Sequence, residues 1–495
     1  MAEEDPIVSG QSEKRHSLGT RTLHGMAWAY GAYFGGRMLV LVSTAILARL
    51  LTPADFGVVA IALLFMTFLD AIKDFGLGNA LILSYPGQEA ERAQTVFAWT
   101  IVIGLGLSLG TCAIAPLISS FFHEPTLTWM LAAIGANFTL RALGSTHYAI
   151  ARKELNYRVR TVSEIAEVTV RGFLSIGLAI AGLGAWSLTL GFIAGVCAST
   201  LSLWYMVDFR PKARLARNHL RDLLKFGGAL TLVDIGATLI YNLDYIFVGR
   251  VLGAAQLGLY TIGFRLPELA ILNLANVAAD VLFPAYSSLD QHRLTDAYLM
   301  TLRYIAIGTL PVATGLIILA RPVTLVAFGP QWTASIPVMQ VITLYTLAVA
   351  FTIPSGTIFK VTGRARLMVI FTVPAVFVLA ALLALFAHEG IATVAWATTG
   401  VQAVGLPLTI LVASRQLRVA LWRSAQAIAP AVASVAPMVV VLLAINAAIG
   451  PPVLTLLLGI PAGAVTYLGL LLIVSRDSLE RLRSLAFPGR AAVRS

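Results

Sequence analysis

Long apolar runs alternate with short polar segments from about residue 24 to residue 474. A helix needs about 20 consecutive apolar residues to cross the hydrocarbon core of a bilayer, and fourteen runs have that length. The pattern predicts an all-α polytopic membrane protein with 14 transmembrane helices and no loop long enough to form a separate domain. The predicted spans are 24–48, 55–77, 93–121, 126–150, 159–182, 185–207, 225–248, 257–283, 297–319, 334–359, 366–387, 390–413, 428–448 and 453–474.

Basic residues are distributed unevenly over the polar segments. With the N-terminus in the cytoplasm, 28 of the 35 Lys and Arg residues lie in tails or at cytoplasmic ends of predicted helices. Cytoplasmic loops of membrane proteins carry such an excess, so we expect a multi-pass protein with both termini in the cytoplasm. The same asymmetry accounts for the net charge of +11 without a nucleic acid partner. Only 12% of the residues are charged and the mean hydropathy is +0.84, which excludes a soluble domain.

The longest connection between predicted helices is basic and separates six helices from the next six. An even number of helices in each half predicts two parallel repeats, related by an axis along the membrane normal. The predicted organisation is a cytoplasmic tail (1–22), an N-lobe (23–208), a cytoplasmic linker (209–224), a C-lobe (225–414), two further helices (415–475) and a second cytoplasmic tail (476–495).

Two short echoes favour this repeat. The segment 49–57 begins Arg-Leu-Leu and ends in Gly, and the segment 250–258 begins Arg-Val-Leu and ends in Gly. A Gly–Arg pair eight residues apart, at 144 and 152, recurs at 356 and 364. Because both echoes occur in the same order along the chain, we interpret them as traces of two halves built on one plan.

Several charged residues fall within or at the ends of the predicted spans. A charge inside the membrane is costly unless it has a partner or faces a water-filled cavity. Guanidinium groups offer planar sets of donors that suit phosphate oxygens, so a cationic cavity for a pyrophosphate group is one interpretation, built from Arg37, Arg141, Arg171 and Arg265. The candidates for coupling to H⁺ or Na⁺ are the acids Asp70, Asp74, Glu167, Asp244 and Glu268, and the candidates for a cavity rim are Arg49 and Arg250.

The same charges also fit purely structural roles. Glu167 and Arg171 are four residues apart, and Arg265 and Glu268 are three apart, so each pair can form an ion pair on one helix face. Asp74, next to a lysine near a helix end, fits a solvated end charge. Arg49 and Arg250 also suit anchoring of helix ends at the membrane interface.

The motifs of common enzyme classes are absent from the sequence. It contains no Gly-rich phosphate loop with a Lys-Ser/Thr ending, and the outer segments are too short for a catalytic domain. Cys112 and Cys197 lie in apolar runs and lack metal-ligand spacing. We therefore expect no enzymatic activity, no cofactor and no metal site.

Three segments resemble the oligosaccharide flippase family of polysaccharide biosynthesis transporters. They are ARLLTPADFGVVAIA at 48–62, FGLGNALI at 75–82 and LDYIFVGRVLGAAQLGLYTIGFRLPE at 243–268. This family belongs to the multidrug/oligosaccharidyl-lipid/polysaccharide exporter superfamily, and the chain is similar to its colanic-acid-type and succinoglycan-type exopolysaccharide exporters. The resemblance implies a flippase in the bacterial inner membrane that moves undecaprenyl-pyrophosphate-linked oligosaccharide repeat units for exopolysaccharide or lipopolysaccharide synthesis.

The resemblance also implies ion-coupled alternating access of two six-helix lobes, with membrane lipid and the lipid-linked oligosaccharide as partners. Polymerase and export machinery are further candidate partners. A cation-coupled multidrug extruder of the same superfamily is the alternative, although cationic drugs favour an acid-dominated cavity. A membrane polymerase would need a long outer loop with clustered Arg, His and acids. A non-transporting assembly subunit would have little reason to bear the cost of intramembrane charges.

Overall fold

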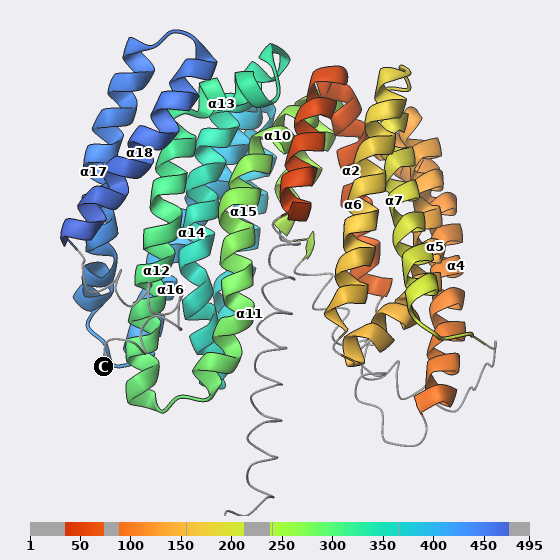
Figure 1. Ribbon diagram of the computed structural model, residues 1–495, viewed down its shortest axis with the longest axis horizontal. Coiled ribbons are helices and arrows are strands. Elements are labelled where there is room, and N and C mark those ends of the chain that lie inside the picture. Colours follow the sequence, from red (N-terminus) through yellow and green to blue (C-terminus); the bar gives the residue numbers. More distant parts are fainter. Residues whose placement is uncertain are drawn as a thin grey trace, which may run out of the picture. The chain divides into compact units, whose positions relative to one another are not determined.

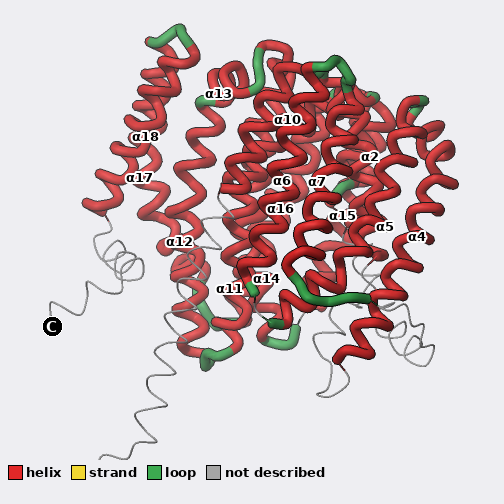
Figure 2. The backbone as a smooth tube through the Cα atoms, turned by 45° about the vertical axis from the view of Figure 1, so that its right-hand side comes forward, coloured by secondary structure: helices red, strands yellow, loops and turns green. Residues whose placement is uncertain are grey.

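The computed structural model describes residues 35–73, 89–154, 156–211, 238–239, 241–364 and 366–474. In these ranges the backbone is helical, with short turns between helices and no strands (Figure 2). Two compact units divide the chain, Met1–Asn242 and Leu243–Ser495. The predicted tails 1–22 and 476–495 and most of the predicted linker 209–224 lie outside the described residues.

Unit 1 is a bundle of long helices. Helix α6 packs along α7, α4 packs along α5, and α2 contacts both α5 and α7. Figure 1 shows α4 to α7 as roughly aligned neighbours. The helices of this unit are an unlabelled helix at 35–50, α2 (Pro53–Lys73), α4 (Glu89–Phe122), α5 (Thr126–Lys153), α6 (Tyr157–Ile180) and α7 (Ala185–Met206).

Unit 2 has its core around α12, α14, α16 and α17, where buried side chains such as Tyr298, Phe351 and Ala413 form one cluster. Its helices are α9 (Leu243–Phe247), η2 (Val248–Leu252), α10 (Ala254–Pro267), η3 (Glu268–Leu272), α11 (Asn273–Ser287), α12 (Gln291–Ile318), α13 (Ala320–Ala327), η4 (Pro330–Ser335), α14 (Ile336–Val361), α15 (Arg366–Phe386), η5 (Ala387–Glu389), α16 (Ile391–Gln416), α17 (Leu421–Ala448) and α18 (Pro452–Val474).

Nine helical segments within the described ranges are long and apolar enough to cross a membrane. This result confirms the predicted class, an all-helical multi-pass membrane protein. Helix α6 is not among the nine, because Glu164, Glu167 and Arg171 lie in its central part. In unit 1, α6 packs along an apolar neighbour, α7, which is one of the nine.

The predicted span 257–283 is not one regular α-helix. Two α-helices, α10 and α11, are joined by the π-helical turn η3, which follows directly after Pro267. Proline has no N–H to donate and its ring clashes with the carbonyl four residues earlier. A π-turn lets the backbone shift its hydrogen-bond register at such a point. The helix therefore continues past Pro267 instead of ending there.

Candidate functional site

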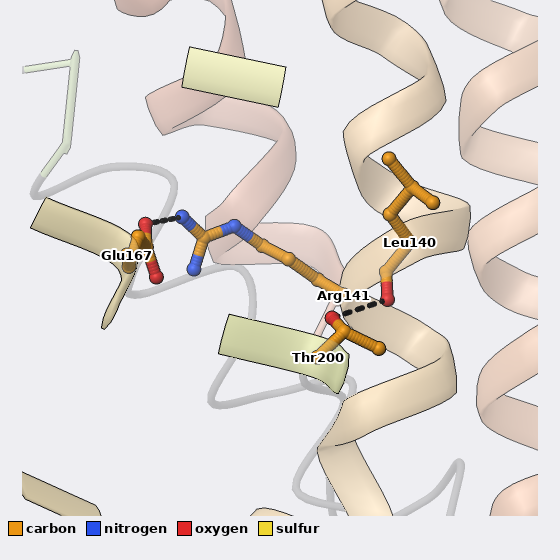
Figure 3. A network of polar contacts seen from close by, with 4 residues as sticks. All are labelled: Leu140, Arg141, Glu167 and Thr200. Atoms are coloured by element: carbon orange, nitrogen blue, oxygen red, sulfur yellow. Dashed lines mark hydrogen bonds and ion pairs between the residues drawn. The ribbon is translucent and has the colours of Figure 1, made fainter. Parts of the chain in front are cut away.

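An ion pair joins two helices of unit 1. Arg141 of α5 donates from Nη2 to Oε1 of Glu167 of α6 at 2.8 Å (Figure 3). The side chain of Arg141 is 33% exposed and that of Glu167 is 20% exposed, so the pair is half-buried. Beside it, the Thr200 hydroxyl of α7 donates to the Leu140 carbonyl at 3.1 Å, which fixes α7 against α5. Arg141 and Glu167 are thus held between three helices.

Phe192 of α7 brings a second arginine to this pair. The guanidinium carbon of Arg171 lies 4.8 Å from the centroid of the Phe192 ring, and that of Arg141 lies 5.8 Å from it. Guanidinium groups are attracted to the electron-rich face of an aromatic ring. Two arginines therefore share one ring, with one carboxylate beside them. We call Arg141, Glu167, Arg171 and Phe192 the arginine cluster.

Two glycines of α7 let α6 approach closely enough to form this cluster. A Cβ at Gly195 would lie 2.7 Å from the Glu167 carbonyl oxygen and 2.9 Å from the Arg171 Cβ. A Cβ at Gly191 would overlap the Ser175 hydroxyl and lie 2.9 Å from the Arg171 carbonyl oxygen. Small residues at such crossings bring helix backbones together in membranes. The glycines of α7 thereby set the position of Glu167 and Arg171.

Polar atoms without partners lie on the same face of α5. The Nε of Arg141 is buried and has no hydrogen-bond partner among the described residues. Asn137, one turn earlier, is fully buried, and in the described part of the chain neither its amide oxygen nor its amide nitrogen has a partner. A buried group without a hydrogen bond costs about 1–3 kcal/mol. This face of α5 therefore has unused donors and an unused acceptor beside the arginine cluster.

The remaining predicted residues of unit 1 lie on the first two described helices. Arg37 is half-buried on the helix 35–50, and Arg49 is exposed at the end of that helix. Asp70 is half-buried near the end of α2. Asp74 lies outside the described residues. The structure thus brings Arg141, Glu167 and Arg171 together.

In unit 2, Arg265 and Glu268 form the ion pair expected from their spacing, with 3.5 Å between Nη1 and Oε2. Arg250 is exposed in the π-helical turn η2. Asp244 is only 4% exposed. Its Oδ2 accepts a 2.6 Å hydrogen bond from the Tyr260 hydroxyl, and its Oδ1 accepts one of 2.9 Å from the Tyr245 backbone N–H. Asp244 is therefore held by neutral donors.

Aromatic rings surround this carboxylate. Tyr245 and Tyr260 lie edge to face with centroids 5.4 Å apart, and Phe264 contacts both rings at 5.9 and 6.2 Å. Tyr345 of α14 contacts Phe264 at 5.9 Å. The sequence drew attention to Asp244 but contains no signal for Tyr260, because a separation of 16 residues has no fixed geometry in a membrane bundle.

A capping network at the start of α2 was also missed. Asp55 Oδ2 accepts hydrogen bonds from the backbone N–H and the hydroxyl of Thr52, at 2.9 and 2.7 Å. Its Oδ1 accepts from the Ala185 backbone N–H at the start of α7, at 2.9 Å. The Thr-x-x-Asp spacing resembles a capping box, which is a recognisable signature. The residues Thr52–Asp55 therefore join two helix starts.

The described helices define an all-helical, multi-pass membrane protein. The structure is similar to that of the lipid II flippase MurJ in an inward closed conformation, with a TM-score of 0.74, 16% identity, and coverage of 92% of this chain and 100% of that one. It is also similar to an inward-facing multidrug resistance MATE family transporter of the MOP superfamily, with a TM-score of 0.59, 16% identity, and coverage of 77% and 95%. At these identities the likeness concerns the fold.

The chain belongs to the polysaccharide biosynthesis protein family, whose model matches residues 46–337, more than half of the sequence. The succinoglycan biosynthesis transport protein ExoT of Rhizobium meliloti (strain 1021) is 25% identical over 64% of this chain and 65% of its own length. The lipopolysaccharide biosynthesis protein WzxC of Escherichia coli (strain K12) is 24% identical over 70% of this chain and 71% of its own length. The family expected from the three sequence segments is confirmed.

Proposed function

We propose that this protein is a flippase that moves undecaprenyl-pyrophosphate-linked oligosaccharide repeat units across the bacterial inner membrane, for exopolysaccharide or lipopolysaccharide synthesis. Its membership of the polysaccharide biosynthesis protein family supports the substrate class. The names of ExoT and WzxC, a transport protein and a lipopolysaccharide biosynthesis protein, point in the same direction. The protein acts as a transporter and not as an enzyme.

The arginine cluster is the observation that carries this proposal. A pyrophosphate group has several oxygens and a high negative charge, and guanidinium groups bind such oxygens through parallel N–H donors. Arg141 and Arg171 share one aromatic ring, and Arg141 keeps a buried Nε donor without a hydrogen-bond partner among the described residues. In our proposal Arg37 and Arg265 also bind phosphate oxygens, and Arg49 and Arg250 attract the anionic group.

Asp244 is the proposed residue for ion coupling. Its carboxylate is buried, and its hydrogen bonds come from a tyrosine hydroxyl and a backbone amide. A carboxylate in apolar surroundings needs a proton or a bound cation to balance its charge. Binding of H⁺ or Na⁺ at Asp244 would therefore bias one conformation of the transporter over another.

In this proposal the chain forms fourteen transmembrane helices, arranged as two parallel six-helix lobes with α17 and α18 added, and both termini are cytoplasmic. One feature supports the repeat. The helix 35–50 ends just after Arg49 and is followed by a turn, and η2, which contains Arg250, ends at Leu252 and is followed by the turn at Gly253. Alternating access of the two lobes moves the head group, while the polyprenyl tail stays in lipid. Polymerase and export machinery are the proposed downstream partners.

The test is a gene deletion with a chemical readout. We expect loss of secreted polysaccharide and accumulation of complete repeat units on the cytoplasmic face of the inner membrane. Complementation with Arg37→Ala or Arg171→Lys is expected to fail at normal membrane abundance, because the first removes the charge and the second removes the planar donor set. The control variant Arg321→Gln, at an exposed arginine of α13, is expected to restore export.

Two outcomes would contradict the proposal. Polymer export that persists in both arginine variants would remove the proposed phosphate-binding roles of Arg37 and Arg171. Normal polymer in the deletion strain, together with altered drug tolerance, would favour the alternative, a cation-coupled multidrug extruder. The MATE-like fold is compatible with that alternative, and the strain comparison separates the two functions.

A further inference from the structure

Three connections meet at one end of unit 2. The Thr362 hydroxyl, after α14, donates to the Gln416 side-chain oxygen at the end of α16, at 3.0 Å. The Thr295 hydroxyl, in the first turns of α12, lies 3.5 Å from the Leu417 carbonyl oxygen. These contacts place the α11–α12, α14–α15 and α16–α17 connections side by side. Figure 2 shows the α11–α12 connection at the lower end of the helices.

This end of unit 2 is strongly basic. The segments 290–296, 360–366 and 414–424 contain seven Lys and Arg residues and two Asp residues. One of the acids, Asp290, is already used, because it caps the first turn of α12 through Arg293 N–H at 2.9 Å and lies 3.8 Å from the Arg293 guanidinium. All six basic residues of the other two segments are exposed: Lys360, Arg364, Arg366, Arg415, Arg418 and Arg423. We call these six residues the basic end.

Arg418 occupies a backbone position that favours glycine. Helix α14 ends with Gly363 at φ 70°, and α16 ends with Arg418 at φ 55°. The hydrogen bonds are equivalent: Arg364 N–H to the Phe359 carbonyl at 2.8 Å, and Val419 N–H to the Ser414 carbonyl at 2.8 Å. Only glycine adopts this conformation without a steric cost. At the end of α16, the exposed arginine Arg418 therefore occupies a position at which the backbone conformation alone would favour glycine.

Large apolar side chains adjoin the charges. Trp422 is 59% exposed and Leu421 is 47% exposed at the start of α17, directly before Arg423. A surface that is basic and aromatic at once is suited to the region between lipid head groups and acyl chains. A soluble acidic partner would account for the charges alone and would leave the exposed tryptophan without a role. The charge is also one-sided, since the described turns at the other ends of these helices contain few basic residues, such as Arg250 and Arg321.

We propose that the basic end is a binding site for the phosphate head groups of anionic lipids in the surrounding leaflet, with Trp422 packed at the acyl boundary. Arg418 and Arg423 bind phosphate from the α16–α17 connection, and Arg364 does so from the α14–α15 connection. By the positive-inside rule this leaflet is the cytoplasmic one. The inference concerns the lipid around the protein, and it is independent of the proposed transport substrate.

The test compares two triple variants of equal charge change. Arg364→Gln/Arg418→Gly/Arg423→Gln removes three charges from the basic end, and the glycine suits the backbone at position 418. The matched control, Arg152→Gln/Arg158→Gln/Arg321→Gln, removes three exposed charges elsewhere. Native mass spectrometry of the purified full-length chain measures the association of phosphatidylglycerol and of phosphatidylcholine with identical acyl chains.

Each basic residue near a lipid surface strengthens binding about fivefold. We expect phosphatidylglycerol to bind the first variant at least tenfold more weakly and the control variant by a clearly smaller factor, with little change for phosphatidylcholine in either variant. An equal loss in both triple variants would show that net charge alone matters and would overturn the site. Unchanged phosphatidylglycerol binding in the first variant would overturn the lipid site and would leave the basic residues only their role in setting the orientation of the chain in the membrane. Displacement of the lipid by millimolar inorganic phosphate would assign the site to soluble phosphate instead.

Discussion

Replacement of Gly195 by alanine tests the packing on which the arginine cluster depends. Gly195 lies on α7 against the backbone of α6, between Glu167 and Arg171. A single methyl group added there touches the helix that carries both charged residues. The substitution therefore perturbs the positions of the two side chains without changing their chemistry.

The size of the effect follows from the contact distances. The new Cβ would lie 2.7 Å from the Glu167 carbonyl oxygen, whereas ordinary contact begins at 3.4 Å. The obstacle is backbone, which cannot rotate away as a side chain can. The helices must therefore separate by roughly 0.7 Å, and overpacking of this kind costs about 1–3 kcal/mol. For a unit of this size the melting temperature should fall by about 2–10 °C.

The assay is thermal unfolding of the purified protein in detergent, combined with polysaccharide export in cells. Gly177→Ala is the matched control, because Gly177 lies on α6 and a Cβ there would meet nothing within 4 Å. We expect the control to keep its Tm and its transport, and Gly195→Ala to lose Tm and to transport more slowly. If the two variants have the same Tm, the close approach of α6 and α7 does not hold the cluster in place.

Three further variants test other contacts. Asp55→Ala should lower the Tm by a few degrees, because it removes the acceptor of three hydrogen bonds at two helix starts, worth about 1–2 kcal/mol; an unchanged Tm would contradict this role. Asp244→Asn should abolish ion-dependent transport with little change in Tm, since the amide oxygen can accept from the Tyr245 N–H and the amide nitrogen can donate to the Tyr260 hydroxyl, while the charge is lost; transport that still responds to the ion gradient would exclude Asp244. Arg141→Glu should cost about 1–3 kcal/mol, and the exchange Arg141→Glu/Glu167→Arg should restore the Tm but not export; equal Tm values for the single and double variants would show that the two residues do not interact.

The positions of most helices could be predicted from the apolar runs because a bilayer sets both the length and the composition of a spanning helix. The predicted span 126–150 corresponds to Thr126–Lys153, and 185–207 corresponds to Ala185–Met206. The start of α17 is earlier than predicted, at Leu421 instead of 428, because the helix includes a polar first turn. A hydropathy pattern cannot predict a helical turn that contains polar residues and lies at the membrane surface.

The candidate site was predictable only in its residue types. Charges inside apolar runs identify Arg141, Glu167 and Arg171 as unusual, but their contacts depend on helix rotation, which hydropathy does not specify. The spacing of Glu167 and Arg171 drew attention to a pair along α6, whereas the ion pair found for Glu167 runs across to Arg141 of α5. Phe192 had no signal at all, because one phenylalanine in an apolar helix is indistinguishable from the lipid-facing residues around it.

The environments of the acids also narrow the choice of coupling residue. Glu167 and Glu268 each have an arginine partner, and such a partner stabilises the charged carboxylate without any bound ion. Asp244 differs, because its contacts within the described part of the chain are a tyrosine hydroxyl and a backbone amide, neither of which carries a charge. Only a carboxylate of this kind changes its energy greatly when H⁺ or Na⁺ arrives, since the ion supplies the missing charge in an apolar setting. A coupling ion must have such a differential effect to shift a conformational equilibrium, and of Glu167, Asp244 and Glu268 it is Asp244 that meets this condition best.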